Sequence, residues 1–137
     1  MANHRCPCGQ PRHLKQCCLL YINGEALPVT AEALMRSRYT AYTLKRWDYL
    51  KESWAPDYCP DNIEQHDRQL RWLGLTITAT TAGQATDDNG TVTFIAELRE
   101  KGQRHTLREE SQFIKRDGRW YYQQGKSTVT PYHPNKK

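Results

Sequence analysis

Four cysteines lie within the first eighteen residues of the chain, in the pattern Cys-x-Cys-x8-Cys-Cys. The four are Cys6, Cys8, Cys17 and Cys18. Four thiolates on so short a segment can surround one metal ion tetrahedrally, with metal–sulfur distances of about 2.3 Å. Such a soft ligand set favours Zn²⁺, with Fe²⁺ as the competing ion. Because the protein fills all four positions, none remains for an activated water, and the pattern predicts a structural metal site.

Two disulfides are the alternative use of four cysteines, as in small secreted domains. Residues 1–20 carry several basic residues and no apolar run of the length that a secretory signal requires. We therefore expect a reducing, cytoplasmic location, in which thiols persist and bind metal. Cys17 and Cys18 are adjacent in the chain, so they could hardly pair with each other without straining the peptide. These points favour metal over disulfides.

Basic residues surround the cysteines, and no acidic residue occurs in the first twenty positions. The cations are Arg5, Arg12 and Lys15. They can offset the negative charge of a tetrathiolate site, and they are our candidates for contact with an acidic partner. His4 and His13 are weaker candidate ligands, because four sulfurs already complete the coordination.

The N-terminal segment resembles a known metal-binding motif. Cys6-Pro7-Cys8-Gly9 through Lys15-Gln16-Cys17-Cys18 is similar to the SEC-C motif, the small metal-binding tail of the SecA translocation ATPase. Gln10-Pro11 and Leu19 depart from it, since the motif usually has Ser-Gly and glycine there, but the four ligand positions are intact. We therefore expect a metal clasp that docks on a cytoplasmic partner, with a chaperone such as SecB, the ribosome or nucleic acid as candidates.

Length and charge set limits on the remainder. The chain has 137 residues, a formal net charge of +5 and an isoelectric point near 9.0. This length suits one domain plus the clasp, and its apolar runs are too short to span a membrane. The net charge allows a weak attraction to nucleic acid, but the basic residues are mostly scattered and most of them are expected to be solvated.

Hydrophobic periodicity divides the chain into helices followed by strands. Apolar residues at three- and four-residue spacing predict a helix over 31–47, with Thr30 as its N-cap and Glu32 in the first turn. Shorter helices are expected over 48–54 and about 61–70.

After residue 70 the period changes to two, which predicts strands beginning near residue 73 and over 91–100, 105–115 and 119–124. Asp87-Asp88-Asn89-Gly90 is typical of a hairpin turn. Helices followed by an antiparallel meander make an α+β plan, in which a curled sheet under helices can form a cone with a pocket.

We expect four segments: a clasp over 1–20, a connector over 21–30, an α+β domain over 31–130 and a flexible tail over 131–137. On this division the domain has its own core. Loss of the metal should then disorder the clasp and leave the domain folded.

The central domain carries a second resemblance. The segments Leu34-Met35-Arg36-Ser37-Arg38-Tyr39-Thr40-Ala41-Tyr42, Trp72-Leu73-Gly74-Leu75 and Phe113 through Gly118-Arg119-Trp120-Tyr121-Tyr122 are similar to the YchJ-like family. In Leu107-Arg108-Glu109-Glu110-Ser111 the match is partial, because a histidine is common where Arg108 stands. With the clasp, the resemblance covers nearly the whole chain. It implies a nuclear-transport-factor-2-like cone behind an N-terminal SEC-C clasp, and it implies no reaction.

A polar pocket inside the cone is the alternative functional site. Glu109 and Phe113 share one face of the third strand, so both face the interior if Phe113 is in the core. Arg38 from the first helix could meet Glu109 there, as a structural bridge or as part of a binding site. The aromatic candidates for the same pocket are Tyr42, Trp72 and Trp120.

Three functions therefore remain open at this point. The first is an adaptor that docks through the clasp, and it is the one that we favour. The second is a small-molecule-binding or enzymatic cone with a cavity around Arg38 and Glu109. The third is nucleic-acid binding through the basic clasp and helix. Cys59, the fifth cysteine, is expected to be an ordinary half-buried thiol, and a monomer and a homodimer are both compatible with the sequence.

Overall fold

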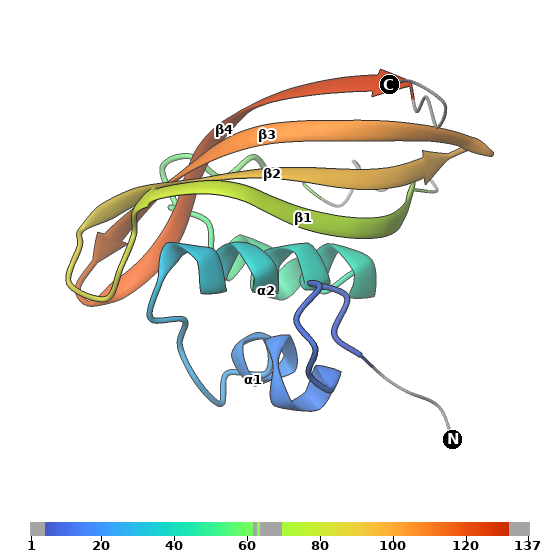
Figure 1. Ribbon diagram of the computed structural model, residues 1–137. Coiled ribbons are helices and arrows are strands. Elements are labelled where there is room, and N and C mark those ends of the chain that lie inside the picture. Colours follow the sequence, from blue (N-terminus) through green and yellow to red (C-terminus); the bar gives the residue numbers. More distant parts are fainter. Residues whose placement is uncertain (1–4, 62, 64–69, 132–137) are drawn as a thin grey trace.

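The computed structural model describes residues 5–61, 63 and 70–131. The helical part comes first and consists of η1 (Leu14–Gln16), α1 (Cys18–Ile22), α2 (Ala31–Leu44) and α3 (Trp47–Glu52). The strands follow as β1 (Leu70–Ala82), β2 (Asn89–Glu100), β3 (Gln103–Arg116) and β4 (Arg119–Pro131). The four strands form one antiparallel sheet in the order β1-β2-β3-β4. In Figure 1, α2 lies against one face of the curved sheet, and α1 with the N-terminal loop lies on the far side of α2.

Strand alternation sets the inner face of the sheet, as the sequence predicts. Val92, Phe94 and Ala96 of β2 are buried. In β3 the inner residues Ser111 and Phe113 are buried, whereas Arg108, Glu110 and Gln112 of the outer face are exposed. The register of β2 and β3 places Phe94 opposite Glu109, so Glu109 is on the inner, helix-facing side of the sheet.

Helix α2 is the central element of the fold. It begins at the predicted N-cap, where Thr30 Oγ1 accepts a hydrogen bond from Ala33 N at 3.1 Å. It ends at Leu44 rather than at residue 47, because Lys45 adopts a left-handed conformation with φ of 58° and closes the helix. Trp47, predicted to end this helix, instead begins α3.

Two predicted boundaries of the sheet are wrong. Asn89 and Gly90 belong to β2, and the hairpin turn lies before them, with Gly83 N donating to Asn89 O at 3.0 Å. A Cβ at Gly90 would lie 2.5 Å from the backbone of Gly83, so this close crossing requires glycine. Strand β4 continues to Pro131 instead of ending at Gln124. The third predicted helix, 61–70, falls mostly outside the described residues, and Leu70 begins β1.

The hydrophobic core runs without interruption from the sheet to the N-terminal cysteines. One cluster of buried residues contains all four clasp cysteines together with Leu34, Tyr39, Val92 and Trp120. The sequence predicts a core apart from the clasp, whereas the buried residues of the clasp and the domain form one continuous cluster. The reason is that α2 is buried on two sides, including its polar residues Ser37 and Thr40. Within the described residues, no helix is long and apolar enough to cross a membrane.

Candidate metal centre and cavity

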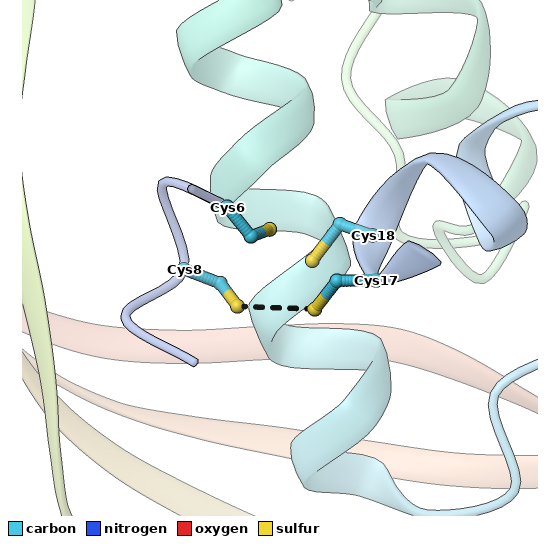
Figure 2. A group of neighbouring side chains, drawn as sticks. All are labelled: Cys6, Cys8, Cys17 and Cys18. Carbon is cyan, nitrogen blue, oxygen red and sulfur yellow. Dashed lines mark hydrogen bonds between the residues drawn. The ribbon is translucent and has the colours of Figure 1, made fainter. Parts of the chain in front are cut away.

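The four predicted metal ligands converge in space. Their Sγ atoms all lie within 4.8 Å of one another, and all four residues are buried. Figure 2 shows the side chains directed at a common centre beside α2. The Cys8 and Cys17 sulfurs are 3.7 Å apart, and tetrahedral coordination with bonds of about 2.3 Å requires sulfur–sulfur distances of about 3.8 Å. The cluster therefore fits a tetrathiolate metal ion such as Zn²⁺ or Fe²⁺.

Local backbone geometry brings the two cysteine pairs together. The first pair stands on a tight turn in which Gly9 N donates to Cys6 O at 3.3 Å, and Gly9 has a φ of 96° that favours glycine. Cys6 N donates to Arg12 O at 2.9 Å, which closes the loop. The second pair stands at the junction of η1 and α1, where Cys17 ends one helix and Cys18 begins the next.

Two polar residues of α2 hold the clasp against the domain. Cys6 Sγ lies 3.6 Å from Thr40 Oγ1, and Arg36 Nη1 donates to Cys8 O at 2.6 Å. Arg36 is itself fixed by its ion pair with Glu32, at 3.0 Å. Sequence reasoning missed these supports. Their spacing in the sequence could have indicated them, because residues 36 and 40 are one turn apart and share a helix face.

Electrostatics within the cluster call for a cation. Hydrogen bonds from the thiols of Cys18 and Cys8 lower the pKa of Cys6, and donation to Cys6 in turn raises the pKa of Cys18. Burial, reinforced by the negative charge of neighbouring thiolates, raises the pKa of Cys17 to about 12. Four buried thiolates would repel one another, and a divalent ion bound by the four sulfurs would supply the charge that keeps them deprotonated.

The three predicted partner-contact residues Arg5, Arg12 and Lys15 are exposed on the outside of the clasp. Arg5 pairs with His13 through an antiparallel backbone bridge, so the two ends of the cysteine loop are tied together. Whether these cations contact a partner stays a prediction.

A cavity of about 190 Å³ lies between α2 and the sheet. Its lining comes from α2, α3 and all four strands: Met35, Arg38, Tyr39, Tyr42, Trp47, Leu70, Trp72, Phe94, Leu107, Glu109 and Tyr122. Of the predicted pocket residues, Arg38, Tyr42, Trp72 and Glu109 therefore lie together. Trp120 does not line the cavity. It is buried elsewhere in the core, where its indole Nε1 donates to Val29 O at 3.2 Å.

Arg38 is buried at the cavity wall, but no direct ion pair with Glu109 forms among the described residues. Instead, its Nη1 donates to Leu50 O at 2.9 Å and to Ser53 Oγ at 2.7 Å. Both acceptors lie at the carboxyl end of α3, where backbone carbonyls carry partial negative charge and favour a cation. The guanidinium also lies 4.8 Å from the ring centroid of Trp54 and 4.5 Å from that of Tyr122. Burial still lowers the pKa of Arg38.

Glu109 faces the same end of the cavity with neutral donors. Its Oε2 accepts hydrogen bonds from Ser111 Oγ at 2.6 Å and from Tyr122 OH at 3.0 Å. Tyr122 thus contacts both charged groups, because its ring stacks on the Arg38 guanidinium and its hydroxyl donates to the Glu109 carboxylate. Gly125 on β4 leaves the space for Glu109, because a Cβ there would lie 2.7 Å from the Glu109 Cδ atom.

A curved antiparallel sheet with helices on its inner face, preceded by a buried cysteine cluster, defines a nuclear-transport-factor-2-like protein with a SEC-C-type clasp. The family model described as YchJ, middle NTF2-like domain, matches residues 30–125. The chain belongs to the YchJ-like family.

Relatives and solved structures agree with this assignment. A UPF0225 protein of Bordetella pertussis is 43% identical over 122 residues, covering 88% of this chain and 90% of its own. The UPF0225 protein of Chromobacterium violaceum is 39% identical over 127 residues, covering 90% of this chain and 93% of its own.

Among solved structures, the solution structure of a SEC-C motif containing protein from Rhodopseudomonas palustris is similar, with a TM-score of 0.79 and 33% identity. That match covers 89% of this chain and 97% of that one. The crystal structure of a SEC-C motif containing protein from Psychrobacter arcticus has a TM-score of 0.72 and 26% identity. It covers 86% of this chain and 79% of that one.

Proposed function

We propose that the protein is a metal-binding adaptor, in which a zinc-bound clasp presents a rigid basic surface to an acidic cytoplasmic partner. The observation that carries the proposal is the group of four buried cysteines whose sulfur atoms all lie within 4.8 Å of one another. Such a site holds a segment in one shape and leaves no open position for chemistry at the metal. The clasp would therefore act through the residues on its outer surface.

The exposed side chains on and after the clasp support docking. Arg5, Arg12 and Lys15 project from a segment without acidic residues. The connector that follows α1 exposes two apolar side chains, Leu27 at 53% and Val29 at 65%. The cations of the clasp can bind a negatively charged partner, and the exposed side chains of the connector offer a separate apolar contact. Candidates for the partner are a SecB-like chaperone, the ribosome and nucleic acid.

The test measures binding of the zinc-loaded chain to purified SecB, ribosomes and single-stranded RNA. The variant replaces Arg5, Arg12 and Lys15 by Ala. The matched control replaces Arg71, Arg99 and Lys126, which are exposed on the sheet, by Ala as well. Selective loss in the clasp variant supports the adaptor. Equal loss in both variants, or no binding to any of the three, contradicts it.

Salt dependence separates nucleic acid from a protein partner. If RNA is the partner, the logarithm of the affinity falls linearly with the logarithm of the salt concentration, by about 0.7 per phosphate contacted on a single strand. A partner held by the apolar connector residues shows a weaker dependence, because burial of apolar surface is not screened by salt.

A small-molecule-binding cone is the second candidate function. The observation that favours it is the cavity itself, with a buried arginine and a carboxylate at the wall of an otherwise largely aromatic and aliphatic space. Apolar cavities with a few convergent polar groups are the usual form of ligand sites.

A further inference from the structure

The walls of the cavity are formed by aromatic rings that hold one another in place. The ring of Trp72 on β1 packs against Tyr39 at 5.8 Å and against Tyr42 at 6.0 Å, both on α2. Tyr42 also packs edge-on against Trp47 of α3, at 6.1 Å. Because these rings come from three elements and pack against one another, the side chains have little freedom to move into the cavity. The cavity is therefore a preformed slot for a flat apolar group.

Among the described residues, the polar end of the slot contains one positive group, Arg38, and one negative group, Glu109. Arg38 is 3% exposed, and among the described residues its acceptors, Leu50 O and Ser53 Oγ, are both neutral. Glu109 receives its hydrogen bonds from two neutral hydroxyl donors, those of Ser111 and Tyr122. Neither charge is neutralised by a direct ion pair within the described part of the chain, so each remains available to a ligand across the cavity.

The charges at this end determine which ligand the site accepts. A ligand anion is attracted by Arg38 but repelled by Glu109. A ligand cation is attracted by Glu109 but repelled by Arg38. Next to a largely apolar lining these electrostatic terms are large, and a charged ligand also loses hydration on entering. An uncharged group that both donates and accepts hydrogen bonds satisfies the two residues together.

The volume limits the size of the ligand. A cavity of about 150 Å³ lined by aliphatic and aromatic residues accommodates benzene, and this one is about 190 Å³. One six-membered ring with a short substituent therefore fills it. We propose that the cavity binds an uncharged, planar single-ring compound whose substituent is both donor and acceptor, as a carboxamide is. This deepens the second candidate function and rests on it.

Three probes of the same shape test the proposal, namely benzamide, benzoate and benzamidine, which are neutral, anionic and cationic at pH 7. Each is titrated into the metal-loaded full chain while amide resonances are followed by NMR. The expected result is saturable binding with benzamide tightest and with the shifts of Tyr42, Trp72 and Glu109 following the titration. Benzoate or benzamidine binding most tightly would overturn the proposal but keep the binding cone. No saturable binding by any of the three overturns both.

A charge-removing variant provides the independent check. Glu109→Gln keeps the shape and still accepts hydrogen bonds, but among the described residues it leaves Arg38 as the only charge at this end. Benzoate should then gain about tenfold in affinity relative to benzamide. The matched control is Glu110→Gln, the next residue of β3, whose side chain is exposed on the opposite face. An unchanged benzoate-to-benzamide ratio in Glu109→Gln, or the same gain in Glu110→Gln, contradicts the assignment.

Discussion

The Sγ of Cys6 lies 3.6 Å from the Oγ1 of Thr40, across 34 residues of sequence. This contact joins the cysteine cluster to the middle of α2, the helix whose opposite side lines the cavity. Residues 36 and 40 face the clasp, and residues 38 and 42, offset by about 200° around the helix axis, face the cavity. One helix thus supports both candidate sites, and metal binding is expected to stabilise the whole domain.

Removal of the metal should therefore destabilise the sheet as well as the clasp. Cys8→Ser is expected to lower the free energy of unfolding of the entire domain by several kcal/mol, because a structural metal site contributes its binding energy to folding. Thermal unfolding followed by tryptophan fluorescence, which reports the buried Trp120, measures this. Cys59→Ser is the control, since Cys59 lies outside the cluster. A sheet transition that stays at its original temperature in Cys8→Ser would show that the clasp is energetically separate.

Arg38 is predicted to matter for stability through its contacts to α3 and the aromatic rings. Arg38→Ala removes the hydrogen bonds from the guanidinium to Leu50 O and Ser53 Oγ and the stacking on Trp54 and Tyr122. We expect a loss of about 2–4 kcal/mol in urea unfolding. Arg38→Lys should recover part of it, because the ammonium keeps the charge at the end of α3 but cannot stack as a plane. The control Arg108→Ala, on the exposed face of β3, should change stability by less than about 0.5 kcal/mol.

Gly125 is predicted to be required by the side chain that crosses it. Gly125→Ala places a methyl group against the Glu109 carboxylate, and we expect it to destabilise the domain by about 1–3 kcal/mol. In the background of Glu109→Ala the same change should cost clearly less, which a double-mutant cycle measures. Gly74→Ala is the matched control, because nothing lies within 4 Å of a Cβ at that strand position. Additive effects in the cycle would show that Glu109 is not the obstacle.

The free energy of unfolding should decrease at alkaline pH, because burial of tyrosine hydroxyls disfavours their ionisation in the folded state. Burial raises the pKa of Tyr39 and of Tyr49 from 10.0 to about 12. Above pH 10 the unfolded chain releases these protons while the folded chain keeps them, so the free energy of unfolding decreases with pH up to about 12. Urea midpoints at about pH 9, 10 and 11, together with the ultraviolet absorbance of tyrosinate, test this. A constant midpoint over this range would contradict the burial of these hydroxyls.

The sequence predicted those features that depend on local pattern. Cysteine spacing predicted the cluster, and alternation along β3 predicted that Glu109 shares the inward face of Phe113. The end of α2 was not predictable, because Lys45 carries no residue-type preference for the left-handed conformation that it adopts. The extension of β4 was missed because residues 125–131 are mostly exposed and show no apolar alternation.

The surroundings of Arg38 depend on contacts between distant elements. A carboxylate partner was the natural expectation for a buried arginine. The structure instead uses the end of α3 and the face of Tyr122. Neither contact can be predicted from residue spacing, because α3 is short and the register of β4 is shifted by a bulge beside Phe113. The continuity of the core with the clasp was missed because it also depends on a contact between distant segments. Nothing in the sequence distinguishes Thr40, which contacts Cys6, from other polar helix residues.

The central claim is that the four clasp cysteines bind one metal ion within the core of the domain. Metal analysis of the purified chain, combined with thiol counting, tests it most directly. We predict about one zinc or iron per chain, with Cys59 the single reactive thiol in the metal-loaded form and all five cysteines reactive after chelation and unfolding. A chain that binds no metal, with more than one thiol reactive in the folded state or with disulfides in the cluster, would contradict the account.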